Sequence, residues 1–195
     1  MASFQESESG DPGAPGPHSI IGQVLESGVL RVVFHWRGDR FGHRIEHQIS
    51  GQWRAVVASL EGSPDEAWPP SPALQTLHIE RRATGPVALL VGKAGTSHWS
   101  ASIEPLSDQA GFQFDIACRV QQPPWQLGST YQSPPTGGRP IVDITATSQE
   151  ALCELAAHEQ STVVRIRPLE LPAERRSTIR WRYRAIPHAA AYSPG

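Results

Sequence analysis

Histidine and carboxylate side chains alternate along three segments that the sequence predicts to be strands. In a strand, every second residue points to the same side, which places His78 and Glu80 together on the segment 74–82. If this segment shares a sheet with 97–104 and 112–120, one sheet face carries His78, Glu80, His98, Glu104, Asp115 and Arg119. Such a face could bind a polyol, or supply a general acid and a general base. The alternative is a solvated face with cross-strand charge pairs.

Two tryptophans lie in proline-rich segments that are predicted to be loops. They are Trp68 in "EAWPPSP" and Trp125 in "QPPWQLGS". A loop tryptophan can stack on a sugar ring, so both are candidate ligand-binding residues. The alternative is that each side chain packs its own loop against the body of the protein.

Arginines recur at alternate positions near the C-terminal end of the sequence. Five of them are predicted to share one face of a hairpin: Arg165, Arg167, Arg180, Arg182 and Arg184. This arginine ladder could hold a phosphate, a sulfate or an acidic polymer. Pairing with glutamates such as Glu154 would instead give it a structural role.

The sequence His-Arg-Ile-Glu-His at 43–47 has the form H-x-x-E-H, which some metalloproteases use to bind zinc from a helix. On a helix, histidines four residues apart can reach one metal ion. Here Arg-Gly-Asp at 37–39 is typical of a turn and predicts a hairpin of 29–36 with 43–49. On a strand the two histidines would lie about 13 Å apart. We therefore interpret the motif as an exposed strand and predict neither a metal site nor a cofactor.

The composition limits the classes of partner. The 195 residues carry a net charge of −2, which gives no general attraction to nucleic acid or to anionic membranes. The basic residues are arginines except for Lys93, and arginine suits carboxylate and phosphate contacts. Cys118 and Cys153 are predicted to be buried thiols. The start of the sequence is not that of a signal peptide, and no apolar run could span a bilayer, so we expect a soluble cytoplasmic protein.

Period-two hydrophobic patterns dominate the sequence and predict an antiparallel β-sandwich of about ten strands. Leu30, Val32, Phe34 and Trp36 define one such strand. One helix is expected at about 148–158, because "TSQE" at 147–150 forms a capping box before a leucine and alanine stripe. Residues 1–17 are expected to be a disordered tail, 18–187 a single domain, and 188–195 a loose tail.

Four stretches resemble segments of uncharacterised β-rich proteins from planctomycete-type bacteria: "WPPSPALQTLHIE", "ALLVGKAGTSHWSASIE", "FDIACRV" and "LGSTY". The resemblance covers roughly residues 30–132 and implies no particular activity. More loosely, an all-β chain with these polar groups on a sheet face is similar to the sugar-handling, galactose-mutarotase-like β-sandwiches.

Three functional hypotheses follow from these patterns. The first is a non-catalytic module that binds a carbohydrate or another polyol on the His/Glu face. The second is a sugar-modifying enzyme of epimerase or lyase type that uses the same groups. The third is an interaction protein that binds an acidic protein or another polyanion through the arginine ladder. Neither a specific nucleic acid nor a membrane is expected as a partner.

Overall fold

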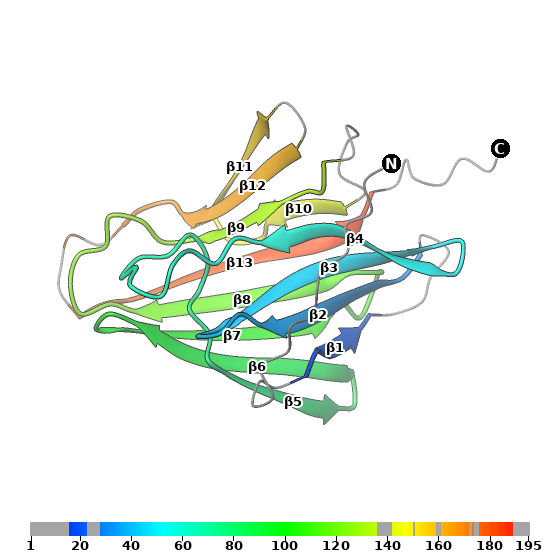
Figure 1. The fold of residues 1–195 in the computed structure, drawn as a ribbon, viewed down its shortest axis with the longest axis horizontal. Coiled ribbons are helices and arrows are strands. Elements are labelled where there is room, and N and C mark those ends of the chain that lie inside the picture. Colours follow the sequence, from blue (N-terminus) through cyan, green and yellow to red (C-terminus); the bar gives the residue numbers. More distant parts are fainter. Residues whose placement is uncertain are drawn as a thin grey trace.

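The computed structural model describes residues 16–22, 28–135, 142–149, 151–158, 161–171, 173 and 176–188. Within them two antiparallel sheets pack face to face, which confirms the predicted β-sandwich (Figure 1). The described residues form thirteen strands and no helix. The predicted tails lie outside the described residues except for 16, 17 and 188.

The larger sheet has seven strands in the order β1-β2-β3-β4-β9-β12-β11. Their bounds are β1 His18–Ile21, β2 Leu30–Trp36, β3 Phe41–Ile49, β4 Gln52–Ser59, β9 Ser129–Gln132, β11 Ala151–His158 and β12 Ser161–Pro168. The smaller sheet has six strands in the order β10-β13-β8-β7-β6-β5. Their bounds are β5 Thr76–Arg82, β6 Gly85–Ala94, β7 Ser97–Pro105, β8 Phe112–Arg119, β10 Val142–Ala146 and β13 Thr178–Pro187.

The core lies between the two sheets and is built from the alternating apolar residues of the central strands. Leu30, Val32 and Phe34 of β2 are fully buried, as the period-two pattern predicts. Trp99 of β7 packs edge-to-face on Trp181 of β13 at 6.0 Å between ring centroids. Burial of such side chains removes apolar surface from water and is the main stabilising term of the fold.

The expected helix at 148–158 is wrong, because residues 151–158 form strand β11. This strand pairs with β12 over its whole length, from Ala151 opposite Pro168 to His158 opposite Ser161. The Ala151 amide donates to the Ser148 carbonyl, so Ser148 and Gln149 of the predicted cap lie in a turn before the strand. Pairing with β12 satisfies backbone groups that would otherwise form a bare sheet edge, and it overrides the local helix propensity.

The predicted hairpin around the H-x-x-E-H sequence is confirmed. Strands β2 and β3 pair up to Trp36 opposite Phe41, and Arg37 N donates to the Arg40 carbonyl across the turn. The strand is not exposed as expected, because His47 is only 2 % exposed and His43 reaches a buried tyrosine. The strand geometry keeps the two histidines from sharing one metal ion.

A chain of polar side chains crosses the core and joins the two sheets. His43 Nε2 of β3 lies 2.7 Å from the Tyr131 hydroxyl of β9, which lies 2.7 Å from the Tyr183 hydroxyl of β13. Beside it, Trp181 Nε1 donates to Ser129 Oγ at 3.1 Å. Burial lowers the pKa of His43 to about 4, so this imidazole is neutral at physiological pH.

Candidate functional site

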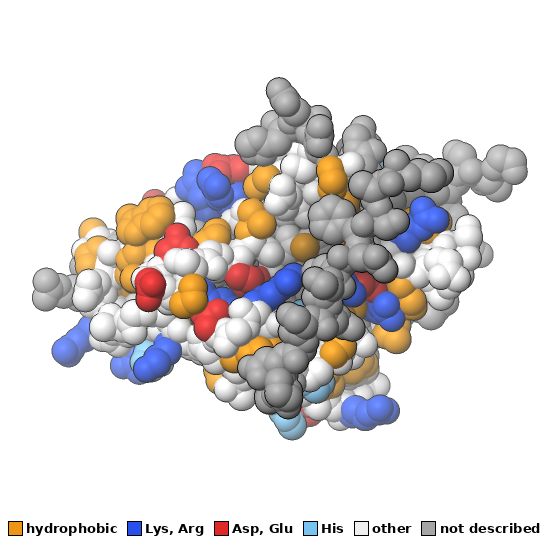
Figure 2. Space-filling model, in the orientation of Figure 1, with side chains coloured by type: hydrophobic (Ala, Val, Ile, Leu, Met, Phe, Trp, Pro, Cys, Tyr) orange, Lys and Arg blue, Asp and Glu red, His pale blue; other side chains and the backbone are white. Residues whose placement is uncertain are grey.

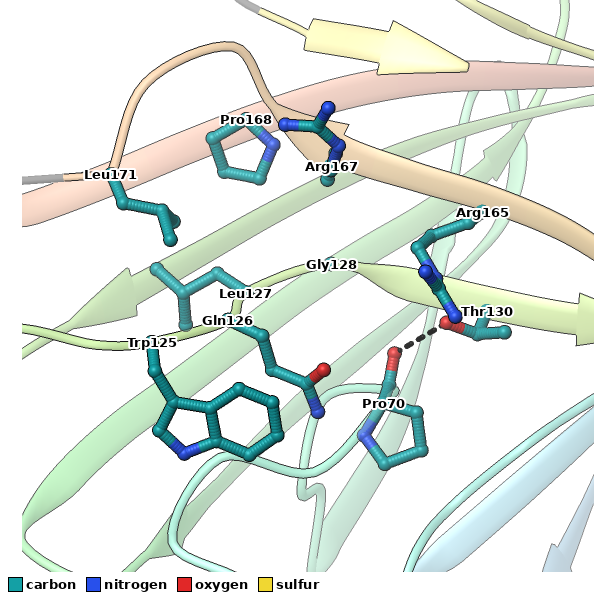
Figure 3. Close-up of a pocket in the computed structure, with 10 residues that line it drawn as sticks. All are labelled: Pro70, Trp125, Gln126, Leu127, Gly128, Thr130, Arg165, Arg167, Pro168 and Leu171. Atoms are coloured by element: carbon teal, nitrogen blue, oxygen red, sulfur yellow. Dashed lines mark hydrogen bonds between the residues drawn. The ribbon is translucent and has the colours of Figure 1, made fainter. Parts of the chain in front are cut away.

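A pocket of about 290 Å³ lies on the seven-stranded sheet beside the loop that enters β9. Ten residues line it: Pro70, Trp125, Gln126, Leu127, Gly128, Thr130, Arg165, Arg167, Pro168 and Leu171. Figure 3 shows Trp125 and Arg165 on opposite sides of this group, with Gln126 between them and Leu127 next to Leu171. Its volume is at the small end of the range of about 300–1,000 Å³ that ligand pockets occupy.

Trp125 supplies an aromatic wall that is open to solvent. Its side chain is 67 % exposed, whereas Trp68 is half-buried and packs on the core. The Trp68 carbonyl accepts a hydrogen bond of 2.7 Å from Gln126 Nε2, so the two loops hold one another in place. Trp68 therefore anchors its loop, as the structural alternative predicts, and Trp125 is the tryptophan whose ring can meet a ligand.

The two arginines of β12 differ in how they are paired. Arg167 donates from Nε and Nη2 to Glu154 Oε1, at 3.1 and 2.7 Å. This hydrogen bond is the main reason that the pKa of Glu154 is lowered. Arg165 is exposed and forms no ion pair or hydrogen bond within the described part of the chain. The guanidinium of Arg165 is thus the pocket cation that can pair with an anionic ligand.

The backbone around the pocket depends on close approach at Gly128. A Cβ atom at this position would lie 2.6 Å from the Ile166 carbonyl oxygen, so only glycine fits against β12 here. On the other side, Thr130 Oγ1 donates to the Pro70 carbonyl at 2.9 Å. These contacts hold three separate segments around one pocket.

The six residues of the predicted polyol face do share the outer face of the six-stranded sheet. Strand register places His78 in line with Leu89, Ser102 and Asp115 on the neighbouring strands. His98 lies four residues along β7 from Ser102, so about 15 Å separates the two histidines. The predicted neighbours are therefore spread along a sheet face, and His78 and His98 cannot contact one small ligand together.

Some of the carboxylates on that face already form ion pairs with arginines. Asp115 accepts from Arg180 and from Arg182 Nε, the latter at 2.9 Å. Glu80 accepts from Arg82 Nη2 at 3.0 Å, and this bond is the main reason that its pKa is lowered. A lowered pKa is the opposite of what a general acid needs at neutral pH. Glu104 faces Gln113 across the strand pair.

The predicted arginine ladder is divided between the two sheets. Strand β12, with Arg165 and Arg167, belongs to the larger sheet, whereas β13 belongs to the smaller one. The segments 161–168 and 178–187 are therefore not a hairpin, and the five arginines do not share a face. The sequence pattern identifies which side chains point outward, but the strand order decides which of them are neighbours.

The pocket brings together Trp125 and Arg165, which the sequence singles out for two different ligands. The sequence did not identify the apolar lining residues Pro70, Leu127, Pro168 and Leu171. The available signal was weak: "LGSTY" has a glycine directly before a short strand, which is typical of close backbone approach.

A second group of buried polar side chains, one of which has a shifted pKa, lies where β3 and β4 meet the loop after β4. Burial raises the pKa of Glu61 to about 7, and hydrogen bonding to Ser59 and the charge of Arg40 oppose this rise. Ser59 Oγ also accepts from His43 N and donates to the His43 carbonyl, both at 2.8 Å. Arg40 is 2 % exposed and donates to the carbonyls of Glu61 and Ser63. These groups hold one another, which indicates a structural polar cluster.

Within the described residues, no three His, Cys, Asp or Glu side chains are placed to share a metal ion. The described part of the chain also contains no helix of the length and hydrophobicity needed to cross a bilayer. Comparison of the chain with protein-family models, with curated proteins and with solved structures finds no match.

Proposed function

We propose that this protein is a non-catalytic binding module for an acidic saccharide, a sugar ring that carries a carboxylate or a sulfate group. One observation carries the proposal: an exposed tryptophan and an arginine that forms no ion pair with a described residue line the same small pocket, since Glu154, opposite Arg165 on β11, is paired with Arg167. Trp125 would stack on the apolar face of the ring, and Arg165 would pair with the anionic group.

The lining of the pocket supports an amphipathic ligand over a simple ion. Leu127, Pro168 and Leu171 offer apolar contacts, whereas Gln126 and Thr130 offer polar ones. A free inorganic anion would use Arg165 but would leave the indole ring without a role. A neutral sugar would use Trp125 but would leave the guanidinium without a partner.

The outer face of the six-stranded sheet is less suited to this role. His78 and Glu80 lie on the edge strand β5, and the carboxylates of Glu80 and Asp115 already accept from arginines. The arginine partners of Glu80 and Asp115 also disfavour the epimerase-like and lyase-like hypothesis, which needs a carboxylate free to act as the base beside a histidine acid.

The test is calorimetric titration and thermal shift with a uronic acid and with the corresponding neutral sugar. The uronic acid is expected to bind more tightly than the neutral sugar. Trp125→Ala should weaken both ligands, because both lose the stacking surface. Arg165→Gln should weaken only the uronic acid, by about tenfold, and so abolish the preference for charge.

Two variants serve as matched controls. Arg81→Gln removes one positive charge from an exposed position on β5, which is in the other sheet from β12. His78→Ala removes a residue of the originally predicted face. Both should bind the uronic acid as the unmodified protein does. If Arg165→Gln retains the preference for the uronic acid, or if His78→Ala abolishes binding, the proposed site is wrong.

A further inference from the structure

Three basic side chains lie in one row across the outer face of the six-stranded sheet. Strand register places Lys93 of β6 directly opposite His98 of β7, and His98 directly opposite Arg119 of β8. Neighbouring strands are about 4.8 Å apart, so the three Cα atoms span only about 10 Å. All three side chains are exposed. In Figure 2 a histidine adjoins basic side chains toward the left end of the molecule.

This basic row has no counter-charge among the described residues. None of Lys93, His98 and Arg119 forms a side-chain hydrogen bond or an ion pair there, whereas Arg180 and Arg182 on the same sheet face share Asp115. Asp115 lies four residues from Arg119 along β8, which is about 13 Å. Adjacent like charges on a sheet are unfavourable, so an unbalanced row is a feature that a bound anion would stabilise.

A pocket continues from the end of this row. Its volume is about 480 Å³, and Thr96, Gln121, Gln122, Pro123 and Arg176 line it. The β8–β13 pairing extends past the strand ends, because Val120 N donates to the Ser177 carbonyl at 2.9 Å. Gln121 and Arg176 lie directly beyond Val120 and Ser177, and both line the pocket. The pocket therefore adds a fourth cation and several neutral donors to the basic row.

We infer that the basic row, Lys93, His98 and Arg119, together with Arg176 in the adjoining pocket, forms an oxyanion site that takes a phosphate or sulfate group. The guanidinium groups would donate paired N–H bonds to the oxyanion, and the Lys93 ammonium would act as a point charge. The site is on a different sheet from Trp125 and Arg165 and does not depend on the proposed saccharide pocket.

The site can be tested by titrating the full chain with inorganic phosphate at constant ionic strength, with chloride as the balancing anion. Binding is followed by calorimetry and by amide chemical shifts. Lys93→Gln/Arg119→Gln should weaken the phosphate Kd by about tenfold or more, because two charge-assisted contacts are lost. The matched control Arg180→Gln/Arg182→Gln removes the same charge from the same sheet face and should change the Kd by at most about twofold.

The amide chemical shifts of the unmodified protein locate the phosphate site, so the test does not depend on a variant that folds well. The largest shifts in the unmodified protein are expected at Lys93, His98, Arg119 and Arg176. Equal phosphate affinity of both double variants, or shifts that map to Arg165 instead, would overturn the inference. A sulfated oligosaccharide forms a second arm of the experiment. If the oligosaccharide binds more tightly than phosphate and Lys93→Gln/Arg119→Gln loses this binding, the natural anionic group belongs to a polymer. If the two ligands bind equally well, the natural ligand is a free ion.

Discussion

The polar groups that join the two sheets have hydrogen-bond partners, whereas several charged groups on the outer sheet faces have none among the described residues. Inside, His43, Tyr131 and Tyr183 hydrogen-bond in series, and each hydroxyl has a partner. Outside, Arg165 and the basic row form no ion pair or side-chain hydrogen bond with a described residue. The pKa of His43 is lowered to about 4 by burial, and burial also raises the pKa of Tyr131.

This difference shows that a shifted pKa and an unpaired charge are separate indications of a functional site. A strongly shifted pKa can indicate an active site, but it also arises wherever a titratable group is buried in a saturated hydrogen-bond network. In this protein burial shifts the pKa values of interior groups, among them His43, Tyr131 and Tyr183, which join the two sheets. The candidate binding sites are instead identified by exposed charges without partners that lie next to a pocket.

The largest expected effect comes from breaking the interior chain at its centre. Tyr131→Phe removes the hydroxyl that lies between His43 Nε2 and Tyr183 Oη, so both lose a buried partner. We expect the free energy of unfolding to fall by about 2 kcal/mol, measured by urea denaturation. Tyr183→Phe keeps the Tyr131–His43 bond and should cost less. Unchanged stability of Tyr131→Phe would show that the chain does not hold the sheets together.

The next effect is a pH dependence in which two buried groups act in opposite directions. The pKa of Glu61 rises on folding to about 7, so the free energy of unfolding should fall as pH rises from about 4.5 to 7. The pKa of His43 falls on folding to about 4, so its contribution should increase with pH between about 4 and 6.5. The two contributions oppose one another over much of the same range.

Glu61→Gln separates these two contributions. The variant should gain stability relative to the unmodified protein as pH rises from about 4.5 to 7, by up to about 3 kcal/mol. The free energy of unfolding of this variant should also rise between about pH 4 and 6.5, because His43 is still present. Urea titrations at several pH values measure both effects, with the exposed Glu170→Gln as the control. Parallel pH profiles for the unmodified protein and Glu61→Gln would contradict the raised pKa of Glu61.

The strands were largely predictable because their pattern is local. The alternation of Leu30, Val32 and Phe34 indicates a half-buried strand whatever its neighbours are. Residues 151–158 were assigned to a helix because their leucines and alanines favour one, and only the partner strand β12 makes them extended. The short strands β1 and β9 offer four residues each, too few for a periodic signal.

The candidate sites depended on information that the pattern does not contain. Alternation correctly assigned Arg165 and Arg182 to outward positions, but it could not reveal that their strands lie in different sheets. Likewise, Trp125 and Arg165 lie 40 residues apart in sequence, and the β9–β12 pairing is what brings them to one pocket. Non-local strand order is set by packing of the whole sandwich, so a single sequence does not specify it at the level of motifs.

The smallest expected effect has a sign that tests the comparison most directly. Arg180→Gln/Arg182→Gln breaks exposed ion pairs with Asp115 and should lower the free energy of unfolding by less than about 1 kcal/mol. Lys93→Gln/Arg119→Gln removes two like charges that lie about 10 Å apart on either side of His98, and should leave stability unchanged or raise it by a few tenths of a kcal/mol at low salt.

Thermal denaturation at low and moderate chloride measures this difference between the two double variants, which should shrink as salt screens the charges. Adding phosphate should reverse the order of the unmodified protein and Lys93→Gln/Arg119→Gln, because a ligand that binds only the folded state stabilises it. A basic row that stabilised the fold by itself would make Lys93→Gln/Arg119→Gln the less stable protein in chloride as well. If the order of stability of the two proteins reverses only when phosphate is present, the basic row binds a ligand. If the variant is less stable in chloride as well, the basic row stabilises the fold.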